Sequence, residues 1–250
     1  MNYVINISKL NLKINNNELL KDFNLKLPSC KRIGITGPSG CGKTTFLRSI
    51  ILGKFPKGSD YEYFEINNIK NVRPRIGYIP QEGGLLPWFS LRRNLSFFVP
   101  RDKPGSNIEE DIRIIANELE LNRCLDNFPD SLSGGEKQRG LLACSILAKP
   151  DIYIADEILT EVDLERKWKA LNILSRAIEE NNASLLLVSH DVEILVHLCD
   201  EIILLHDHPS KIINRYSIEC PHPRSYQDIV KGSPQEIRNE LLSSLENLFN

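Results

Sequence analysis

The chain has 250 residues, a length that fits one large α/β domain or one domain with a small inserted lobe. Hydrophobic residues make up 41% and charged residues 26%, as in globular proteins that fold in water, and the formal net charge of −2 gives no reason to expect a nucleic acid as partner. We find neither a signal peptide nor an apolar run of about 18 residues, so we expect no membrane span. The six cysteines are scattered, which favours reduced thiols in a cytosolic compartment.

The N-terminal part of the chain is expected to be rich in strands. Alternating apolar residues on both sides of the asparagine-rich turn at 15–17 predict two strands joined by that turn. Residues 32–36 (RIGIT) predict a compact apolar strand that leads into glycines and then into a helix starting near Lys43. Residues 61–79 are again β-rich, with one polar side.

Residues 85–130 change to a mostly helical pattern, with a loop at 100–107, and we interpret them as an inserted helical lobe. Strands at 151–155 and 184–188, separated by a helical segment around 164–180, predict a parallel sheet with right-handed crossovers. A further strand is expected at 201–205. In the tail, a capping box with proline at the first helical position begins at Ser233. The apolar face of the tail helix packs either on the body or on a partner, and its residues are Ile237, Leu241, Leu242, Leu245 and Leu248.

Residues 37–44 (GPSGCGKT) match the phosphate-binding pattern G-x-x-x-x-G-K-[ST], between an apolar strand and a helix. Glycines let such a loop wrap its N–H groups around phosphates at the helix N-terminus. Lys43 would neutralise phosphate charge, the Thr44 hydroxyl would bind Mg²⁺, and Thr45 would contact the α-phosphate. The predicted nucleotide-binding residues are Gly37, Pro38, Ser39, Gly40, Cys41, Gly42, Lys43, Thr44 and Thr45.

Hydrolysis of a bound nucleotide also needs a carboxylate for the metal and a group that activates water. The strand at 151–155 leads to Asp156 and Glu157, at the edge of the sheet where ligands bind in open α/β folds. We expect Asp156 to hold Mg²⁺ through water and Glu157 to polarise the attacking water. His190 follows the next strand and is placed to reach the γ-phosphate, and Gln81 is a candidate to sense Mg²⁺ or water.

A second glycine-rich turn, LSGGEKQR at 132–139, raises the question of why one chain would carry two phosphate sites. A Ser-Gly-Gly turn at a helix N-terminus is itself an anion-binding arrangement. Together with the motifs above and their order, this stretch resembles the signature motif of nucleotide-binding subunits of ATP-binding cassette (ABC) proteins. The resemblance covers essentially the whole chain. It implies an α/β P-loop NTPase core with a parallel sheet, an N-terminal antiparallel β subdomain and an inserted helical subdomain.

The resemblance also implies how the chain is divided and how it pairs. We expect an ATPase domain at 1–218, with the helical lobe inserted at approximately 85–145, and a C-terminal tail with an amphipathic helix at 219–250. In the family, two cassettes meet head to tail, and the signature of one faces the ATP of the other. A homodimer would therefore bind ATP and Mg²⁺ between its subunits, with Asp163 at the dimer seam. The expected signature contacts to the partner's ATP are Ser133, Gly134, Gly135 and Gln138.

A finer resemblance concerns residues 83–95 (GGLLPWFSLRRNL) and the proline-rich tail, which are similar to importer ATPases for nitrate, sulfonate and taurine. It implies an ATP-hydrolysing subunit on the cytoplasmic face of the cell membrane that drives a transmembrane permease for a small, anionic compound. The permease would touch the stretch from Leu85 to Trp88, and a substrate-binding protein would be an indirect partner. Alternatively, Trp88 and Phe89 pack within the helical lobe.

Two positions depart from the family pattern. The family stacks adenine on an aromatic side chain near the end of the first strand, where this chain has Asn11 or Leu12, and losing that stack puts base selectivity in doubt. Residues 156–163 read DEILTEVD where the family often has D-E-P-x-x-A-L-D. Glu161 therefore adds a negative charge at the seam, which either slows dimer closure or pairs with a basic group of the partner.

Because the catalytic set is intact, we predict an active ATPase. Two alternatives stay open at this point. One is a soluble ABC ATPase outside transport, such as an assembly factor. The other is a regulatory cassette that binds ATP with little turnover.

Overall fold

The fold is built around one six-stranded sheet that is mostly parallel. The computed structural model describes residues 3–15, 17–67, 73–100 and 107–249. Four neighbouring pairs of strands are parallel, and only the last strand runs antiparallel to its neighbour. In spatial order the strands are β5 (Ile76–Ile79), β6 (Ile152–Asp156), β7 (Ser184–Val188), β3 (Arg32–Thr36), β8 (Glu201–His206) and β9 (Lys211–Ser217).

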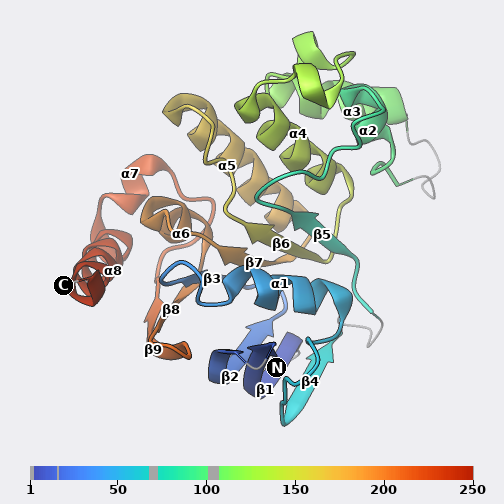
Figure 1. Ribbon diagram of the computed structural model, residues 1–250. Helices are drawn as coiled ribbons and strands as arrows, with labels where there is room; N and C mark the ends of the chain where they lie inside the picture. Colours follow the sequence, from blue (N-terminus) through green and yellow to red (C-terminus); the bar gives the residue numbers. More distant parts are fainter. Residues whose placement is uncertain (1–2, 16, 68–72, 101–106, 250) are drawn as a thin grey trace.

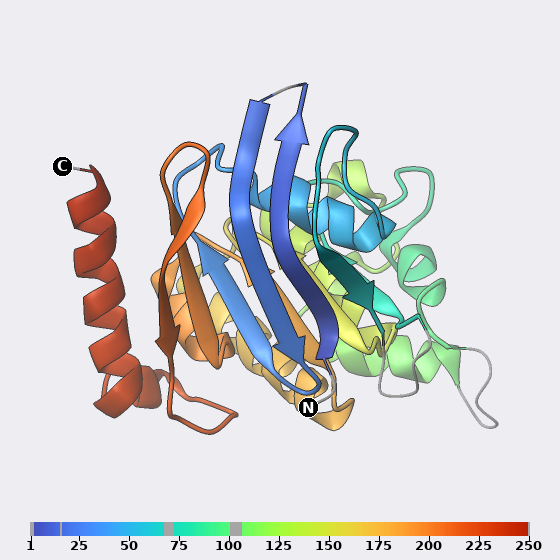
Figure 2. The same ribbon diagram turned by 90° about the horizontal axis from the view of Figure 1, so that it is seen from below.

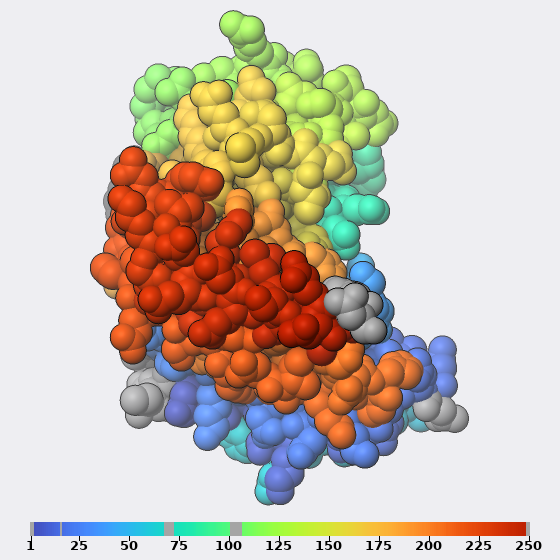
Figure 3. Space-filling view, turned by 90° about the vertical axis from the view of Figure 1, so that its left-hand side faces the viewer, coloured from blue at the N-terminus to red at the C-terminus, as the bar shows by residue number. Residues whose placement is uncertain are grey.

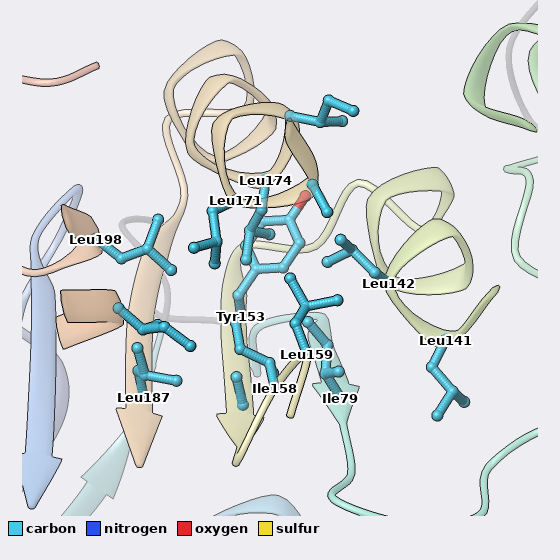
Figure 4. Packing of buried hydrophobic residues seen from close by; sticks show 14 of the residues in the cluster. Ile79, Leu141, Leu142, Tyr153, Ile158, Leu159, Leu171, Leu174, Leu187 and Leu198 are labelled. Carbon is cyan, nitrogen blue, oxygen red and sulfur yellow. The ribbon is translucent and has the colours of Figure 1, made fainter. Parts of the chain in front are cut away.

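The central strands are buried on both faces, which explains why their sequences are continuous apolar runs. Successive residues point to opposite sides of the sheet, so Ile152 and Ile154 join one hydrophobic core while Tyr153 and Ala155 join the other. Figure 4 shows Tyr153 pointing toward the helix that covers the second face. Its hydroxyl accepts a hydrogen bond of 3.3 Å from Asn181 Nδ2, which satisfies the one polar atom of this buried side chain.

A smaller antiparallel sheet forms the N-terminal part, as predicted. Its strands are β2 (Asn17–Pro28), β1 (Tyr3–Ile14) and β4 (Tyr63–Ile66), in that spatial order. The helix α1 (Lys43–Leu52) lies between the two sheets in Figure 1, and Figure 2 shows the long β1–β2 hairpin running across the direction of this helix. Side chains from α1 and both sheets share one hydrophobic core, which holds the start of α1 in place.

Helices cover the opposite face of the six-stranded sheet. They are α4 (Gly134–Leu147), α5 (Leu164–Glu180) and α6 (Val192–Leu198). The region expected to be a helical lobe contains α2 (Leu91–Ser96), α3 (Ile108–Glu118) and two short 3₁₀ turns, Asn122–Cys124 and Pro129–Ser131. Most of the loop expected at 100–107 lies outside the described residues. The lobe packs on α4 at the upper right of Figure 1, so α4 connects it to the sheet.

The C-terminal tail folds back onto the body. It consists of α7 (Tyr226–Ile229) and α8 (Gly232–Phe249), and α8 lies across the face in Figure 3. Leu241 is fully buried, and the other apolar residues of this helix pack against the main core: Ile237, Leu242, Leu245 and Leu248. Of the two roles considered for the apolar face of α8, packing on the body is therefore the one observed.

Three elements, β9, α6 and α7, were missed from the sequence, and several expectations are confirmed. Strand β9 was not predicted, because its exposed residues lack the apolar alternation that marks a half-buried strand. The α/β core with a parallel sheet, an antiparallel β part and inserted helices is confirmed. All six cysteines are free thiols. Within the described residues, no helix combines the length and apolarity needed to span a bilayer.

Candidate active site

The phosphate-binding loop lies where β3 ends and α1 begins. Gly40 and Gly42 adopt left-handed backbone conformations, with φ of 79° and 96°, which side chains disfavour. A Cβ atom on Gly42 would also stand 2.9 Å from Leu19 Cβ, so this position has no room for a side chain. The N-cap of α1 is Gly42, which has no side chain to accept a hydrogen bond from the first turn of the helix. The free N–H groups of the first turn are thus available to an anion.

Lys43 is held inside this loop. Its exposed fraction is 7%, and Nζ donates hydrogen bonds of 2.8 Å to the carbonyl oxygens of Gly37 and Pro38. The ammonium group therefore sits at the centre of the loop rather than in solvent. This places a fixed positive charge where the loop would wrap a phosphate.

Two acidic side chains stand at the end of β6: Asp156 is its last residue, and Glu157 follows it. Asp156 is 1% exposed, and neither of its carboxylate oxygens has a hydrogen-bond partner among the described residues. Burial raises the pKa of Asp156, and the Thr44 hydroxyl and the charges of Arg48 and Lys43 oppose that rise. A buried carboxylate without a partner beside a threonine hydroxyl suits a hard divalent cation, so the donor set of Asp156 and Thr44 fits Mg²⁺.

Glu157 and His190 face each other at the ends of neighbouring strands. His190 Nε2 lies 3.4 Å from Glu157 Oε1, and the His190 N–H donates a 3.3 Å hydrogen bond to Oε2. Burial raises the pKa of Glu157, and these contacts with His190 oppose the rise. Glu157 has a φ of 51°, an uncommon value for a residue with a side chain and one found at functional sites. The side chain is thus held in a defined place, and Oε1, although near His190 Nε2, has no hydrogen-bond partner among the described residues.

These groups line one open cavity of about 380 Å³. It brings together most of the predicted residues of the nucleotide site: Ser39, Gly40, Gly42, Lys43, Thr44, Thr45, Gln81, Asp156, Glu157 and His190. Gly37, Pro38 and Cys41 do not line it, because the first two direct carbonyls at Lys43 and Cys41 is buried behind the loop. Leu19 and Val188 line the cavity although the sequence did not single them out. Both sit in strands, where an apolar residue carries no signal of a site.

The second glycine-rich turn starts α4, as its sequence suggested. Ser133 is the N-cap and forms a capping box with Glu136: the Glu136 N–H donates to Ser133 Oγ at 3.3 Å, and Ser133 N and Oγ donate to Glu136 Oε2 at 2.8 Å and 2.7 Å. Ser133, Gly134, Gly135 and Asp163 line a separate cavity of about 750 Å³. Among the residues that the structure describes, this cavity shares no lining residue with the first.

Gln138 does not line the cavity beside Ser133. It is 9% exposed, and its amide group is used within the chain: Nε2 donates to Thr160 Oγ1 at 2.9 Å, and Oε1 accepts the Glu161 N–H at 3.0 Å. Gln138 therefore fixes the loop that follows Glu157. Asp163 ends this loop and caps α5, accepting hydrogen bonds from Arg166 N and Nη1, which lower the pKa of Asp163.

A third cavity, of about 450 Å³, runs between the segment after β5 and the start of α4. Leu85, Pro87 and Lys137 are among its lining residues. Trp88 lies beside this stretch with 66% of its surface exposed. Its ring contacts Phe89 edge-on, but most of the Trp88 side chain is exposed. Packing within the lobe, one of the two roles considered, therefore accounts for only a small part of the Trp88 surface.

Asn11 occupies its position with its own hydrogen bonds. Nδ2 donates to Asp60 Oδ1 at 2.6 Å, and Oδ1 accepts the Asp22 N–H at 2.9 Å. Leu12 is fully buried. Neither residue lines the cavity around Lys43.

Comparisons with known proteins agree with this geometry. A family model described as ABC transporter matches residues 20–160, more than half of the chain. A relative from Xanthomonas axonopodis pv. citri (strain 306), named aliphatic sulfonates import ATP-binding protein SsuB 1, is 30% identical over 233 residues, covering 92% of each chain. A protein of the same name from Paracoccus denitrificans (strain Pd 1222) is 30% identical over 241 residues, covering 96% of this chain and 92% of that one.

Solved structures show the same fold. A dimeric ATP-binding cassette in a post-hydrolysis state, bound to ADP and phosphate, aligns with a TM-score of 0.71 at 22% identity, covering 89% of this chain and 100% of that one. An ATP-binding subunit of an ABC transporter aligns with a TM-score of 0.71 at 21% identity, covering 96% of this chain and 99% of that one. With its phosphate-binding loop, its acidic strand end and its Ser-Gly-Gly turn in place, the chain belongs to the ABC transporter family.

Proposed function

We propose that this protein is the ATP-hydrolysing subunit of an importer for a small anionic compound of the sulfonate class. The observation that carries the proposal is one cavity lined by Lys43, Thr44, Asp156, Glu157 and His190, at the start of α1 and at the ends of the adjacent strands β6 and β7. A phosphate-binding loop, a buried metal-binding carboxylate and a placed base are the parts that ATP hydrolysis requires. The relatives named as sulfonate import ATP-binding proteins support the substrate class.

The residues divide the work of hydrolysis between binding and proton transfer. The Lys43 ammonium and the N–H groups at the start of α1 offset the charge of the phosphates. Mg²⁺, held by Asp156 and Thr44, would neutralise the charge that develops on the phosphate oxygens. Glu157 Oε1, which has no hydrogen-bond partner in the described part of the chain, accepts the proton of the attacking water, while His190 orients that carboxylate.

The Ser133–Gly135 turn binds the γ-phosphate of an ATP held by a second copy of the chain. Support comes from the separation of the two cavities: the turn and the phosphate-binding loop each have their own set of lining residues. A head-to-tail pair would bring each turn over the other subunit's nucleotide and bury two ATP molecules at the seam. The nucleotide then holds the dimer together, and hydrolysis releases it.

A permease binds the groove beside Leu85 and Lys137. Both apolar and polar residues line the groove, and exposed Trp88, which follows the lining residue Pro87 in the chain, is the kind of side chain that anchors interfaces. This places the subunit against the cytoplasmic side of the membrane through its partner. The two alternatives, a soluble assembly ATPase and a cassette with little turnover, have no observation that favours them over the importer role.

The test uses Glu157→Gln, which keeps the shape of the side chain and removes the base. Loss of a general base lowers the rate about 10²–10⁴-fold, so ATP persists in the variant. Light scattering is then expected to report a dimer with ATP and a monomer with ADP. A monomer with both nucleotides, in protein that still binds labelled ATP, would rule out the shared ATP sites.

A further inference from the structure

Glu161 stands directly against the glycine turn that starts α4. A Cβ atom built on Gly134 would lie 1.7 Å from Glu161 Oε2 and 3.5 Å from Glu161 Cβ. The carboxylate therefore fills the space that the missing side chain of Gly134 leaves open. The backbone of Glu161 is also close to the turn, because its carbonyl oxygen would lie 3.1 Å from a Cβ built on Gly135.

The position of Glu161 is fixed by its backbone rather than by its charge. Its N–H donates to Oε1 of buried Gln138, and the same Gln138 side chain donates to Thr160. Its carboxylate, by contrast, forms no hydrogen bond or ion pair among the described residues. Three arginines line the same cavity as Glu161: Arg123, Arg139 and Arg166. Arg166 is shared between Glu120 and Asp163, and Arg139 Nε donates to the Leu119 carbonyl oxygen.

The turn that Glu161 contacts already carries one carboxylate. Glu136 Oε2 accepts hydrogen bonds from both the N–H and the hydroxyl of Ser133. Glu161 adds a second carboxylate, without an ion pair of its own among the described residues, to a helix start whose free N–H groups favour anions. The Glu161 carboxylate and a phosphate brought to this turn would repel each other, and the repulsion would grow as water is excluded from between them.

Glu161 also has somewhere to move. Gly134 and Glu161 line both the cavity on the Ser-Gly-Gly turn and the groove that contains Leu85 and Lys137. The side chain thus forms the wall between these two spaces. Rotation about its side-chain bonds would carry the carboxylate from the turn into the groove without moving the backbone.

We propose that Glu161 is an electrostatic gate on the Ser-Gly-Gly turn, which opposes binding of the partner's ATP until its carboxylate leaves Gly134. The proposal rests on the proposed head-to-tail binding of ATP. It makes Glu161 an inhibitory positioning residue and excludes the other role considered for it, a stabilising ion pair across the seam. Of the two proposed phosphate sites of this chain, Glu161 would affect the Ser133–Gly135 turn and not the loop around Lys43.

The experiment measures the ATP concentration that gives half-maximal dimer by light scattering, in the Glu157→Gln background. Adding Glu161→Gln removes the charge at constant shape, and adding Glu161→Ala removes charge and bulk. We expect both to lower that concentration about tenfold, equivalent to roughly 1.4 kcal/mol. The difference should shrink in high salt, which a merely steric role would not produce. The control Glu240→Gln removes one charge from the exposed side of α8, on the opposite flank of Figure 1, and should change nothing.

The other outcomes are distinct from each other. Unchanged dimerisation in both Glu161 variants would overturn the gate while leaving the shared ATP sites intact. An effect of Glu161→Ala without one of Glu161→Gln would also overturn it, because bulk rather than charge would be responsible. Weaker dimerisation would show that Glu161 pairs with the partner. If no variant dimerises although all bind labelled ATP, the head-to-tail proposal itself fails and the gate with it.

Discussion

Arg224 ties the C-terminal tail to the body of the protein, and its replacement by methionine gives a quantitative test of the fold. The side chain is 1% exposed and donates to three carbonyl oxygens. Nη1 reaches those of Val196 and Cys199 at 2.6 Å, at the end of α6, and Nε and Nη2 reach that of Cys220 at 3.1 Å and 2.7 Å. Methionine has an unbranched apolar side chain and can donate none of these bonds.

The expected loss follows from the two acceptors on fully buried residues. Leaving a buried carbonyl unsatisfied costs about 1–3 kcal/mol, so Val196 and Cys199 together account for about 4 kcal/mol of unfolding free energy. For a chain of this size, a change of 1 kcal/mol shifts Tm by about 2–4 °C, which predicts a decrease of about 8–16 °C. Thermal unfolding followed by circular dichroism measures it.

A matched variant separates this anchor from ordinary surface contacts. Arg238→Met removes an ion pair of 3.0 Å between α8 and Glu193, whose two side chains are 31% and 35% exposed. Such a pair contributes at most about 1 kcal/mol, so Tm should fall by less than about 4 °C. Equal shifts for the two variants, or a shift below 2 °C for Arg224→Met, would refute the reasoning.

Three further predictions concern nucleotide, pH and partner. Lys43→Ala should lower ATP turnover about 10²-fold or more, measured by phosphate release, whereas the exposed Lys57→Ala should not. Burial lowers the pKa of fully buried His197 to about 4, below its unfolded value. The free energy of unfolding is therefore highest above pH 6.5 with respect to this group, and it falls by up to about 3 kcal/mol as the pH drops through 6.5 toward 4. Urea titrations across that window should show a flatter decline for His197→Phe, and an unchanged slope would contradict the assignment. Trp88→Ala should abolish co-purification of a multi-span membrane protein and leave basal ATPase activity intact, while Tyr63→Ala, also exposed but on β4, should affect neither.

The sequence predicted most of the residues that share the cavity around Lys43, because they belong to contiguous motifs. The loop around Lys43 follows β3, and the acidic pair stands at the end of β6, and parallel strands bring their carboxyl ends to one edge. Contacts between distant segments could not be predicted from the sequence, because no contiguous motif marks them. Leu19 enters the cavity only because α1 packs against β2, and nothing in an alternating strand pattern marks that residue.

Two other findings needed the fold as well. Gln138 belongs to the signature stretch by sequence, yet its place on the inner side of α4 directs its amide group to Thr160 and Glu161. Nothing in the proline-rich tail marks Arg224 as buried, because only the folded chain brings the end of α6 to it. In both cases a polar side chain is buried by long-range packing that local periodicity does not encode.

The loop held by Gln138 has a consequence for the timing of turnover in the proposed dimer. It starts at Glu157, the proposed base for the subunit's own ATP, and passes over the glycine turn that we propose binds the partner's ATP. Because the Gln138 amide group bonds both Thr160 and Glu161, we expect a shift of this loop at Glu157 to change the contact of Glu161 with Gly134. Phosphate release in one subunit would therefore weaken binding of the other nucleotide. The two hydrolysis events in a dimer would then be correlated in time.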